Sequence, residues 1–173
     1  IKDELKEKVA AMKEQGVEVT LAVIQVGDDP ASSRYIRTKE RACEFTGIKS
    51  KPYHLSNSTT TFTLIQLIQS LNADSSVHGI LVQLPLPKHI NEQEVLSAIH
   101  PSKDVDGFHP MNVASLYLKQ PGVVPCTPKG VIKLLKSINY PIQGKNAVVI
   151  GRSNIVGKPM SMLLLHKNGT VTT

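Results

Sequence analysis

A lysine on the apolar side of a predicted amphipathic helix is the first feature of this sequence that suggests chemistry. The segment Ala31 to Thr46 has a helical period and ends at Gly47, a typical C-terminal cap. At about 100° per residue, one arc of this helix collects charged side chains, namely Arg34, Arg37, Glu40, Arg41 and Glu44. The opposite arc holds Ala31, Tyr35, Ile36, Ala42, Cys43 and Phe45, with Lys39 in its middle.

Two interpretations of Lys39 are open, because burying an ammonium group is costly. In the first, the aliphatic stem lies along the apolar surface and the amine reaches solvent. In the second, the amine is partly desolvated in a pocket and acts as a base or a hydrogen-bond donor near neutral pH. Tyr35, one turn earlier, would then stack on a flat ligand.

A single glutamine interrupts a strand that is otherwise suited to burial on both faces. Gln83 is the polar residue of the segment Gly79 to Leu84, which Pro85-Leu86-Pro87 terminates. It stands near the carboxyl end of the strand, where open α/β sheets bind their ligands. A ligand-facing amide and a satisfied core amide are both compatible with this position.

Two acidic residues flank a turn glycine in Asp104-Val105-Asp106-Gly107-Phe108. They are compatible with a metal loop, a turn stabiliser or an acceptor for a polar ring. The further ligands that a hard cation needs are absent, so we expect no metal site here. The six histidines also lack zinc-type spacing, and we expect most of them at the surface.

A glycine-bounded turn, Gly151 to Gly157, connects a predicted strand over Asn146 to Ile150 with a predicted helix over Pro159 to Lys167. Backbone N–H groups and a helix N-terminus in such a turn can meet a phosphate. It is neither a good dinucleotide fingerprint nor a triphosphate loop, because Pro159 stands where a hydroxyl would bind magnesium. Arg152 could pair with a phosphate, although an ordinary tight turn is the alternative.

Composition narrows the class of partner. The 173 residues are 40% hydrophobic and 20% charged, which excludes a disordered or low-complexity chain. Aromatic residues make up 4% and Trp is absent, which argues against a base-stacking surface. The net charge of +6 is spread along the chain, so it suits anionic small molecules better than nucleic acid.

The cysteine count and the hydropathy indicate a compartment. Two cysteines, Cys43 and Cys126, are too few for a disulfide framework, so a reducing compartment is expected. Apolar stretches such as Gly79 to Leu84 are too short to cross a bilayer, and no export signal opens the chain. We therefore expect a cytoplasmic protein with no membrane partner, or a matrix protein of an organelle if the source is eukaryotic.

Helix and strand patterns alternate along the chain, which predicts an α/β fold with a largely parallel sheet. Further helices are expected over Lys2 to Gln15, from Ser58 or Thr59 to Leu71, from Asn91 to Ile99, and from Thr127-Pro128 to Ile138. Further strands are expected over Val17 to Val26, Lys49 to Leu55 and Gly169 to Thr173, and an irregular stretch over His100 to Cys126. We interpret the chain as a piece of a two-domain protein, with a single compact domain as the alternative.

Five segments together resemble the bifunctional methylenetetrahydrofolate dehydrogenase/methenyltetrahydrofolate cyclohydrolase family, in its order and at its spacing. They are Tyr35-Ile36-Arg37-Thr38-Lys39, Val82-Gln83-Leu84-Pro85-Leu86-Pro87, Lys103-Asp104-Val105-Asp106-Gly107-Phe108, Pro125-Cys126-Thr127-Pro128-Lys129-Gly130, and Gly151-Arg152-Ser153 with Val156-Gly157 and Pro159. The resemblance runs nearly end to end.

The resemblance implies a fold and an activity. A three-layer α/β folate domain over residues 1–126 would precede an incomplete Rossmann-like domain over residues 127–173, with the active site in the cleft between them. The enzyme would oxidise 5,10-methylenetetrahydrofolate with NADP and hydrolyse the product to 10-formyltetrahydrofolate. This oxidoreductase and hydrolase chemistry belongs to one-carbon metabolism and supplies purine biosynthesis. A homodimer acting on tetrahydrofolate derivatives, with or without polyglutamate tails, is implied.

The resemblance also implies roles for single residues. Lys39 would be catalytic, Gln83 would hydrogen-bond it, Tyr35 would stack on the folate ring and Asp106 would anchor the pterin edge. Val82 and Leu84 would line the folate site. The cofactor would contact Thr127, Gly151, Arg152 and Ser153, with Arg152 favouring the 2′-phosphate of NADP. Because later strands of the family are absent, a non-catalytic folate- or nucleotide-binding module is the alternative function.

Overall fold

The protein divides into two compact units. The computed structural model describes all residues, 1–173, and separates Ile1–Lys103 from Asp104–Thr173. The division lies earlier than the boundary between residues 126 and 127 that the sequence suggested. Its physical cause is a helix in the stretch expected to be irregular, α5 (Pro110–Tyr117), which packs against α7 (Gly157–Leu165). The extent of the two domains stays a prediction.

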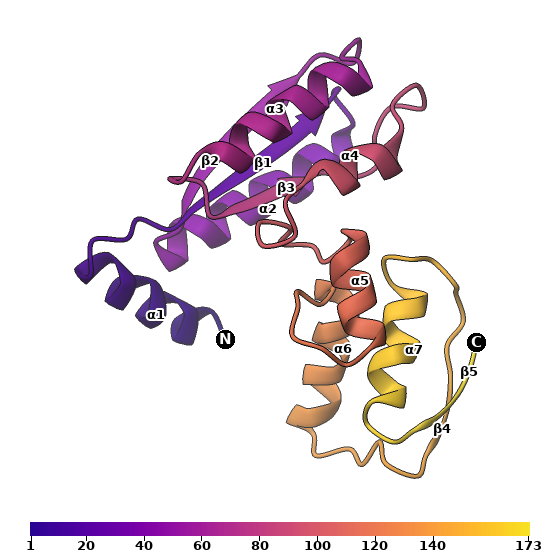
Figure 1. Cartoon of the computed structure of the whole chain (residues 1–173). Coiled ribbons are helices and arrows are strands. Elements are labelled where there is room, and N and C mark those ends of the chain that lie inside the picture. The colour runs from indigo at the N-terminus through magenta and orange to yellow at the C-terminus, as the bar shows by residue number, and fades with distance from the viewer. The chain divides into compact units, whose positions relative to one another are not determined.

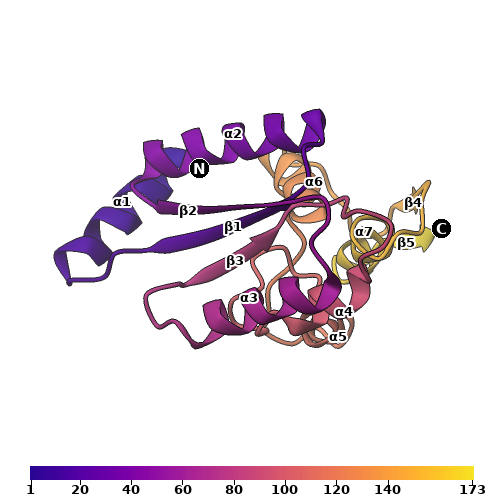
Figure 2. The same cartoon turned by 90° about the horizontal axis from the view of Figure 1, so that it is seen from above.

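The first unit is a three-layer α/β structure. Its elements are α1 (Lys2–Glu14), β1 (Thr20–Val26), α2 (Pro30–Thr46), β2 (Lys49–Leu55), α3 (Thr61–Ala73), β3 (Gly79–Val82) and α4 (Glu92–Ala98). The strands form a parallel sheet in the order β2-β1-β3. Figure 2 shows α2 on one face of this sheet and α3 with α4 on the other. The α/β class with a parallel sheet is confirmed.

The main core lies between the sheet and the α3–α4 layer. It is made of aliphatic side chains, namely Ala22, Ile24, Val26, Leu64, Ile68, Leu71, Val77, Ile80, Val82, Ile90, Val95 and Ile99. Burial of each Val, Leu or Ile side chain contributes about 1.5–3 kcal/mol. This layer fixes β3, and with it the position of the residues that follow the strand.

The ends of α2 are set by local capping. The Asp29 carboxylate accepts a hydrogen bond from the Ser32 N–H at 2.7 Å, and Pro30 occupies the first helical position. At the other end Gly47 adopts the left-handed conformation, φ 80°, as the sequence predicted. The cap of α3 is Thr60 rather than Ser58 or Thr59, because its hydroxyl is the one that reaches the Thr63 N–H.

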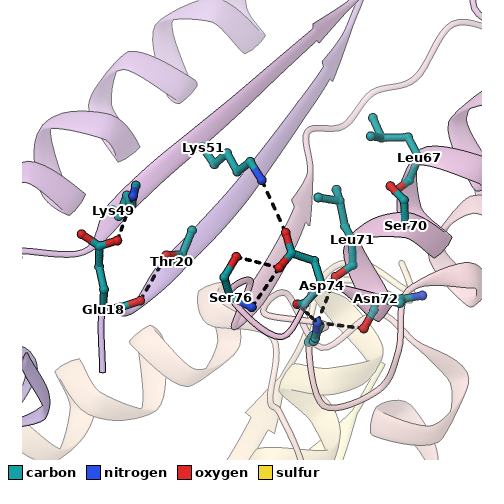
Figure 3. Close-up of polar contacts among 11 residues, drawn as sticks. Glu18, Thr20, Lys49, Lys51, Leu67, Ser70, Leu71, Asn72, Asp74 and Ser76 are labelled. Atoms are coloured by element: carbon teal, nitrogen blue, oxygen red, sulfur yellow. Dashed lines mark hydrogen bonds and ion pairs between the residues drawn. The ribbon is translucent and has the colours of Figure 1, made fainter. Parts of the chain in front are cut away.

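A cluster of hydrogen bonds and ion pairs lies at the amino-terminal edge of the sheet and at the end of α3 (Figure 3). The Lys103 amine donates to the carbonyl oxygens of Leu71, Asn72 and Asp74 at 2.8–2.9 Å. These carbonyls come at the end of α3, where a cation is favoured. The Asp74 carboxylate accepts from Ser76 and pairs with Lys51 at 3.5 Å.

The second unit contains α5, α6 (Cys126–Ser137), β4 (Asn146–Val148), α7 and β5 (Thr170–Thr172). Strands β4 and β5 pair in parallel and are connected through α7, and both α5 and α6 pack against α7 (Figure 1, coral to yellow). This is one βαβ crossover with two additional helices. None of the chain's helices combines the length and the apolar character that a bilayer crossing requires.

Two helix predictions in this unit are wrong. Helix α5 was not expected, although His109 caps it and Pro110 takes its first position. Helix α6 begins at Cys126, not after a Thr127 cap. Pro128 fits inside its first turn because N–H groups there have no partner within the helix, so its missing donor costs little.

Candidate functional site

The amine of Lys39 meets the side chain of Gln83 in the first unit. Lys39 lies in α2, and Gln83 follows β3 directly, where its N–H donates to the Ile24 carbonyl at 2.8 Å. The Lys39 amine donates to Gln83 Oε1 at 3.0 Å across a sequence separation of 44 residues. Both side chains are half-buried. The contact stands at the carboxyl end of a parallel strand, where ligands bind in open α/β sheets.

The face of α2 that carries Lys39 turns toward the sheet. Its buried members are Ser32, Ile36, Cys43 and Thr46. Lys39 lies between Ile36 and Cys43 on this face, at helical spacing from both. The Lys39 amine is therefore half-buried and hydrogen-bonded to Gln83, and its action as a base stays a prediction.

Two other residues expected on the apolar arc do not lie on this buried face. Tyr35 is 62% exposed and Phe45 is 46% exposed, whereas Ser32 and Thr46 are buried in their place. The Thr46 hydroxyl is accommodated because it donates to the Ala42 carbonyl at 2.9 Å. Tyr35 therefore presents its ring to solvent one turn before Lys39, where a ligand can stack on it.

The Gln83 amide is held in one orientation. Its Nε2 donates to the Leu84 carbonyl at 2.6 Å, which leaves Oε1 to accept from Lys39. Leu84 is half-buried, whereas the Val82 side chain is 2% exposed and belongs to the main core. A ligand would therefore meet Val82 through its backbone.

A second buried amide, which sequence reasoning did not single out, secures the start of α2. Gln25 Nε2 donates to the Gly27 carbonyl at 3.0 Å and to the Ser33 hydroxyl at 3.1 Å. The signal was available, because Gln25 is the polar residue in the apolar strand Leu21 to Val26. It holds the first turn of the helix that carries Tyr35 and Lys39.

The two acids around Gly107 have different environments in the second unit. Asp104 is 2% exposed, and its carboxylate accepts from the Gly107 N–H, the His109 N–H and the Asn112 side chain. Asp106, two residues later, is half-buried. Of the interpretations proposed for this pair, Asp104 is therefore the turn stabiliser. All three of these partners are N–H donors.

The turn after β4 is closed by a serine. The Ser153 hydroxyl accepts from the Val156 N–H at 3.2 Å and from the Gly157 N–H at 3.3 Å. Gly151 has φ 133°, and a side chain on Gly157 would collide with the Gly151 carbonyl. The helix start that follows is thus tight and lacks room for a Cβ, as a turn next to a phosphate requires.

A pocket of about 310 Å³ opens beside this turn, within the second unit. Arg152 and Lys158 supply two cations to it, and Val113, Leu116 and Tyr117 supply an apolar wall. Thr127, expected at the cofactor site, is exposed in the first turn of α6. Arg152 and Gly151 therefore meet at one pocket, and Ser153 sits next to it.

Two family models match the chain, one in each part of the sequence. The tetrahydrofolate dehydrogenase/cyclohydrolase catalytic domain matches residues 1–106, and the NAD(P)-binding domain of the same enzymes matches residues 125–173. The chain belongs to this family.

Known members of the family resemble it closely. The bifunctional protein FolD of Agathobacter rectalis is 60% identical over 99% of this chain and 62% of its own length. The structure of Campylobacter jejuni FolD, a methylenetetrahydrofolate dehydrogenase/cyclohydrolase, superposes with a TM-score of 0.97 at 55% identity, covering 99% of this chain and 61% of that one.

A more distant member was solved with a dinucleotide. The Trypanosoma brucei methylenetetrahydrofolate dehydrogenase-cyclohydrolase, complexed with NADP and an inhibitor, gives a TM-score of 0.95 at 36% identity, covering 99% of this chain and 59% of that one. The chain thus spans about three fifths of the length of these relatives.

Proposed function

We propose that the protein to which this chain belongs oxidises 5,10-methylenetetrahydrofolate to the 5,10-methenyl form and then hydrolyses it to 10-formyltetrahydrofolate. The observation that carries this proposal is the half-buried Lys39 amine, hydrogen-bonded to Gln83 at 3.0 Å beside the carboxyl end of β3. Family membership supports the same two activities.

The first step needs positioning more than proton transfer. A hydride leaves the one-carbon bridge of the folate, and the product is a cation stabilised by its two nitrogens. NADP, when bound, accepts this hydride. The contribution of the chain is to hold the folate ring flat, and the exposed Tyr35 ring, one helical turn from Lys39, is suited to stack on it.

The second step uses the Lys39 amine. Water adds to the cationic carbon and loses one proton, which gives a neutral hydroxyl adduct. The adduct then opens at one carbon–nitrogen bond as its hydroxyl proton passes to the departing nitrogen, which leaves the formyl group on the other nitrogen. A neutral amine can take the proton that the water loses, whereas an ammonium group would repel the cation. Gln83 Oε1 accepts from this nitrogen at 3.0 Å and directs it without placing a negative charge beside the cationic carbon.

The dinucleotide is proposed to bind at the pocket beside the Gly151 turn. Arg152 and Lys158 supply cations for phosphate, and the apolar wall of Val113, Leu116 and Tyr117 suits a flat ring. The tight approach of Gly157 to the Gly151 backbone fits a phosphate-binding turn. A second cationic side chain beside Arg152 supports NADP over NAD.

The remaining assignments complete the proposal. Asp106, Val82 and Leu84 contact the folate, and Thr127 and Ser153 contact the dinucleotide. Residues 1–126 form the folate domain and residues 127–173 begin the Rossmann-like domain. The net charge of +6 suits a substrate with a glutamate or polyglutamate tail. The protein is a homodimer and works in the cytoplasm.

The test combines turnover and ligand binding. The protein is mixed with 5,10-methylenetetrahydrofolate and NADP, and the absorbance of the reduced dinucleotide is followed together with formation of 10-formyltetrahydrofolate. Appearance of both products is expected. Thermal stabilisation by tetrahydrofolate with neither product would favour the non-catalytic binding module, and neither stabilisation nor product would contradict both functions.

A further inference from the structure

The loop that carries Asp106 is organised by the acid two residues before it. The buried Asp104 carboxylate gathers three donors: the Gly107 N–H at 3.0 Å, the His109 N–H at 2.9 Å and Asn112 Nδ2 at 2.8 Å. Two of these donors belong to the backbone of the loop itself. The bonds are charge-assisted and are formed at 2% exposure, where solvent does not compete.

Asn112 extends this arrangement to a second segment of the chain. Its Oδ1 accepts from the Val123 N–H at 3.2 Å, so one side chain joins the Asp104 loop to the stretch that leads into α6. The two segments also touch at Gly107, where an added Cβ would lie 2.8 Å from the Val123 carbonyl. Gly107 has φ 72°, a conformation that side chains disfavour.

The backbone on both sides of Asp106 is therefore held by contacts that Asp106 itself does not make. Asp104 precedes Asp106 in the loop, and its carboxylate holds the segment that follows Asp106 through the hydrogen bonds from Gly107 and His109. A carboxylate on such a loop has little freedom to leave its position. The loop therefore loses little conformational entropy when a ligand binds this carboxylate.

We infer that Asp104 is a positioning residue, which fixes the carboxylate of Asp106 for the polar edge of the folate ring through the loop it organises. The inference rests on the proposed folate-binding role of Asp106. Asp104 makes no contact with ligand in this account. Its effect on binding passes through Asp106.

A double-mutant cycle tests whether Asp104 acts on ligand binding through Asp106, with tetrahydrofolate as the ligand. Asp104→Asn places an amide donor against the N–H groups that the carboxylate accepts from, which loosens the loop. We expect it to raise the tetrahydrofolate Kd about tenfold when Asp106 is present and less than about twofold in an Asp106→Ala background. Asp74→Asn, which alters a carboxylate that accepts from the Ser76 N–H, is the matched control and should leave the Kd unchanged.

Hydrogen exchange separates this role from general destabilisation. In Asp104→Asn, the Gly107 and His109 amides should exchange at least about tenfold faster, with the amides of β1 unchanged. If Asp104→Asn does not fold, Gly107→Ala replaces it in the cycle, because its Cβ collides with the Val123 carbonyl. Its control is Gly144→Ala, which has the same positive φ and open space around the Cβ.

The outcomes discriminate between the inference and the proposed function. Equal losses of affinity in both backgrounds, or no loss with Asp106 present, would overturn the positioning role. Failure of the wild-type chain to bind tetrahydrofolate would instead contradict the proposed function, and the inference would fall with it. Faster exchange at Gly107 and His109 together with a non-additive cycle supports the inference.

Discussion

The Lys39 amine lies 3.0 Å from Gln83 Oε1, although 44 residues separate the two in the sequence. The helix α2 and the end of β3 bring them together, and the Gln83–Leu84 hydrogen bond sets the direction of the amide. A neutral acceptor beside an amine orients it without placing a negative charge next to it. A carboxylate in the same place would orient it equally well and would favour the ammonium.

Replacing Gln83 with glutamate separates orientation from charge. In Gln83→Glu we expect the contact with Lys39 to persist as an ion pair, so the pH at which water addition reaches half its maximum should rise. Gln83→Met, which has similar volume and no acceptor, should lower the water-addition rate without that displacement along the pH axis. Rate–pH profiles of methenyltetrahydrofolate hydrolysis measure both effects, and identical profiles for wild type and Gln83→Glu would contradict a role for charge.

Tyr35 should matter for the ligand and not for the fold. Because its side chain is 62% exposed, Tyr35→Ala should change the free energy of unfolding by less than about 0.5 kcal/mol. Loss of a stacked ring should weaken folate binding by about 0.5–1.5 kcal/mol, roughly two- to tenfold in Kd. Tyr35→Phe keeps the ring and should bind normally. Calorimetric titration with tetrahydrofolate compares the three proteins, and normal binding by Tyr35→Ala would remove the stacking role.

Sequence periodicity was enough to predict the elements that local chemistry defines. The bounds of α2, β2 and α4 agree with the expected ones to within one residue, because capping by Asp29, Gly47 and Asn91 is local. Helix α5 was missed and the start of α6 was misplaced. Their positions depend on packing against α7 and on the Asn112–Val123 contact, which join segments distant in sequence.

The candidate site could be predicted only in part for the same reason. The unusual positions of Lys39 and Gln83 were visible as a charge on an apolar arc and an amide in an apolar strand. The sequence pattern alone did not distinguish Asp104 from Asp106. The distinction appears only in the fold, where the Asp104 carboxylate receives three hydrogen bonds.

The N-terminal cap of α2 should make the stability of the fold depend on pH in the acidic range. Hydrogen bonding from the Ser32 backbone, and then from its side chain, holds the pKa of Asp29 below its ordinary value. A lowered folded-state pKa stabilises the fold above the unfolded value of about 3.9, and this stabilisation is lost as the pH falls through the folded value.

Asp29→Asn keeps a capping acceptor that does not titrate. Its Tm should therefore fall less steeply than that of wild type as the pH drops below about 4. Parallel Tm–pH curves for wild type and Asp29→Asn would show that the cap does not titrate with folding.

The two thiols should react at different rates. Burial, together with the nearby Glu40 carboxylate, raises the pKa of the Cys43 thiol, whereas Cys126 is exposed at the start of α6. Because the thiolate is the reactive form, iodoacetamide at neutral pH should modify Cys126 first and Cys43 only after denaturation. Mass spectrometry of the peptides resolves the two sites, and equal rates would contradict the burial of Cys43.

The most direct test of the account replaces the Lys39 amine and measures the two activities separately. In Lys39→Met, which keeps a long apolar side chain, hydrolysis of 5,10-methenyltetrahydrofolate should fall by at least about a hundredfold, the usual contribution of a positioned proton acceptor. Oxidation of 5,10-methylenetetrahydrofolate with NADP should fall much less, and Lys8→Met, on the exposed surface of α1, should change neither rate. Undiminished hydrolysis by Lys39→Met would contradict the role of this amine in water addition.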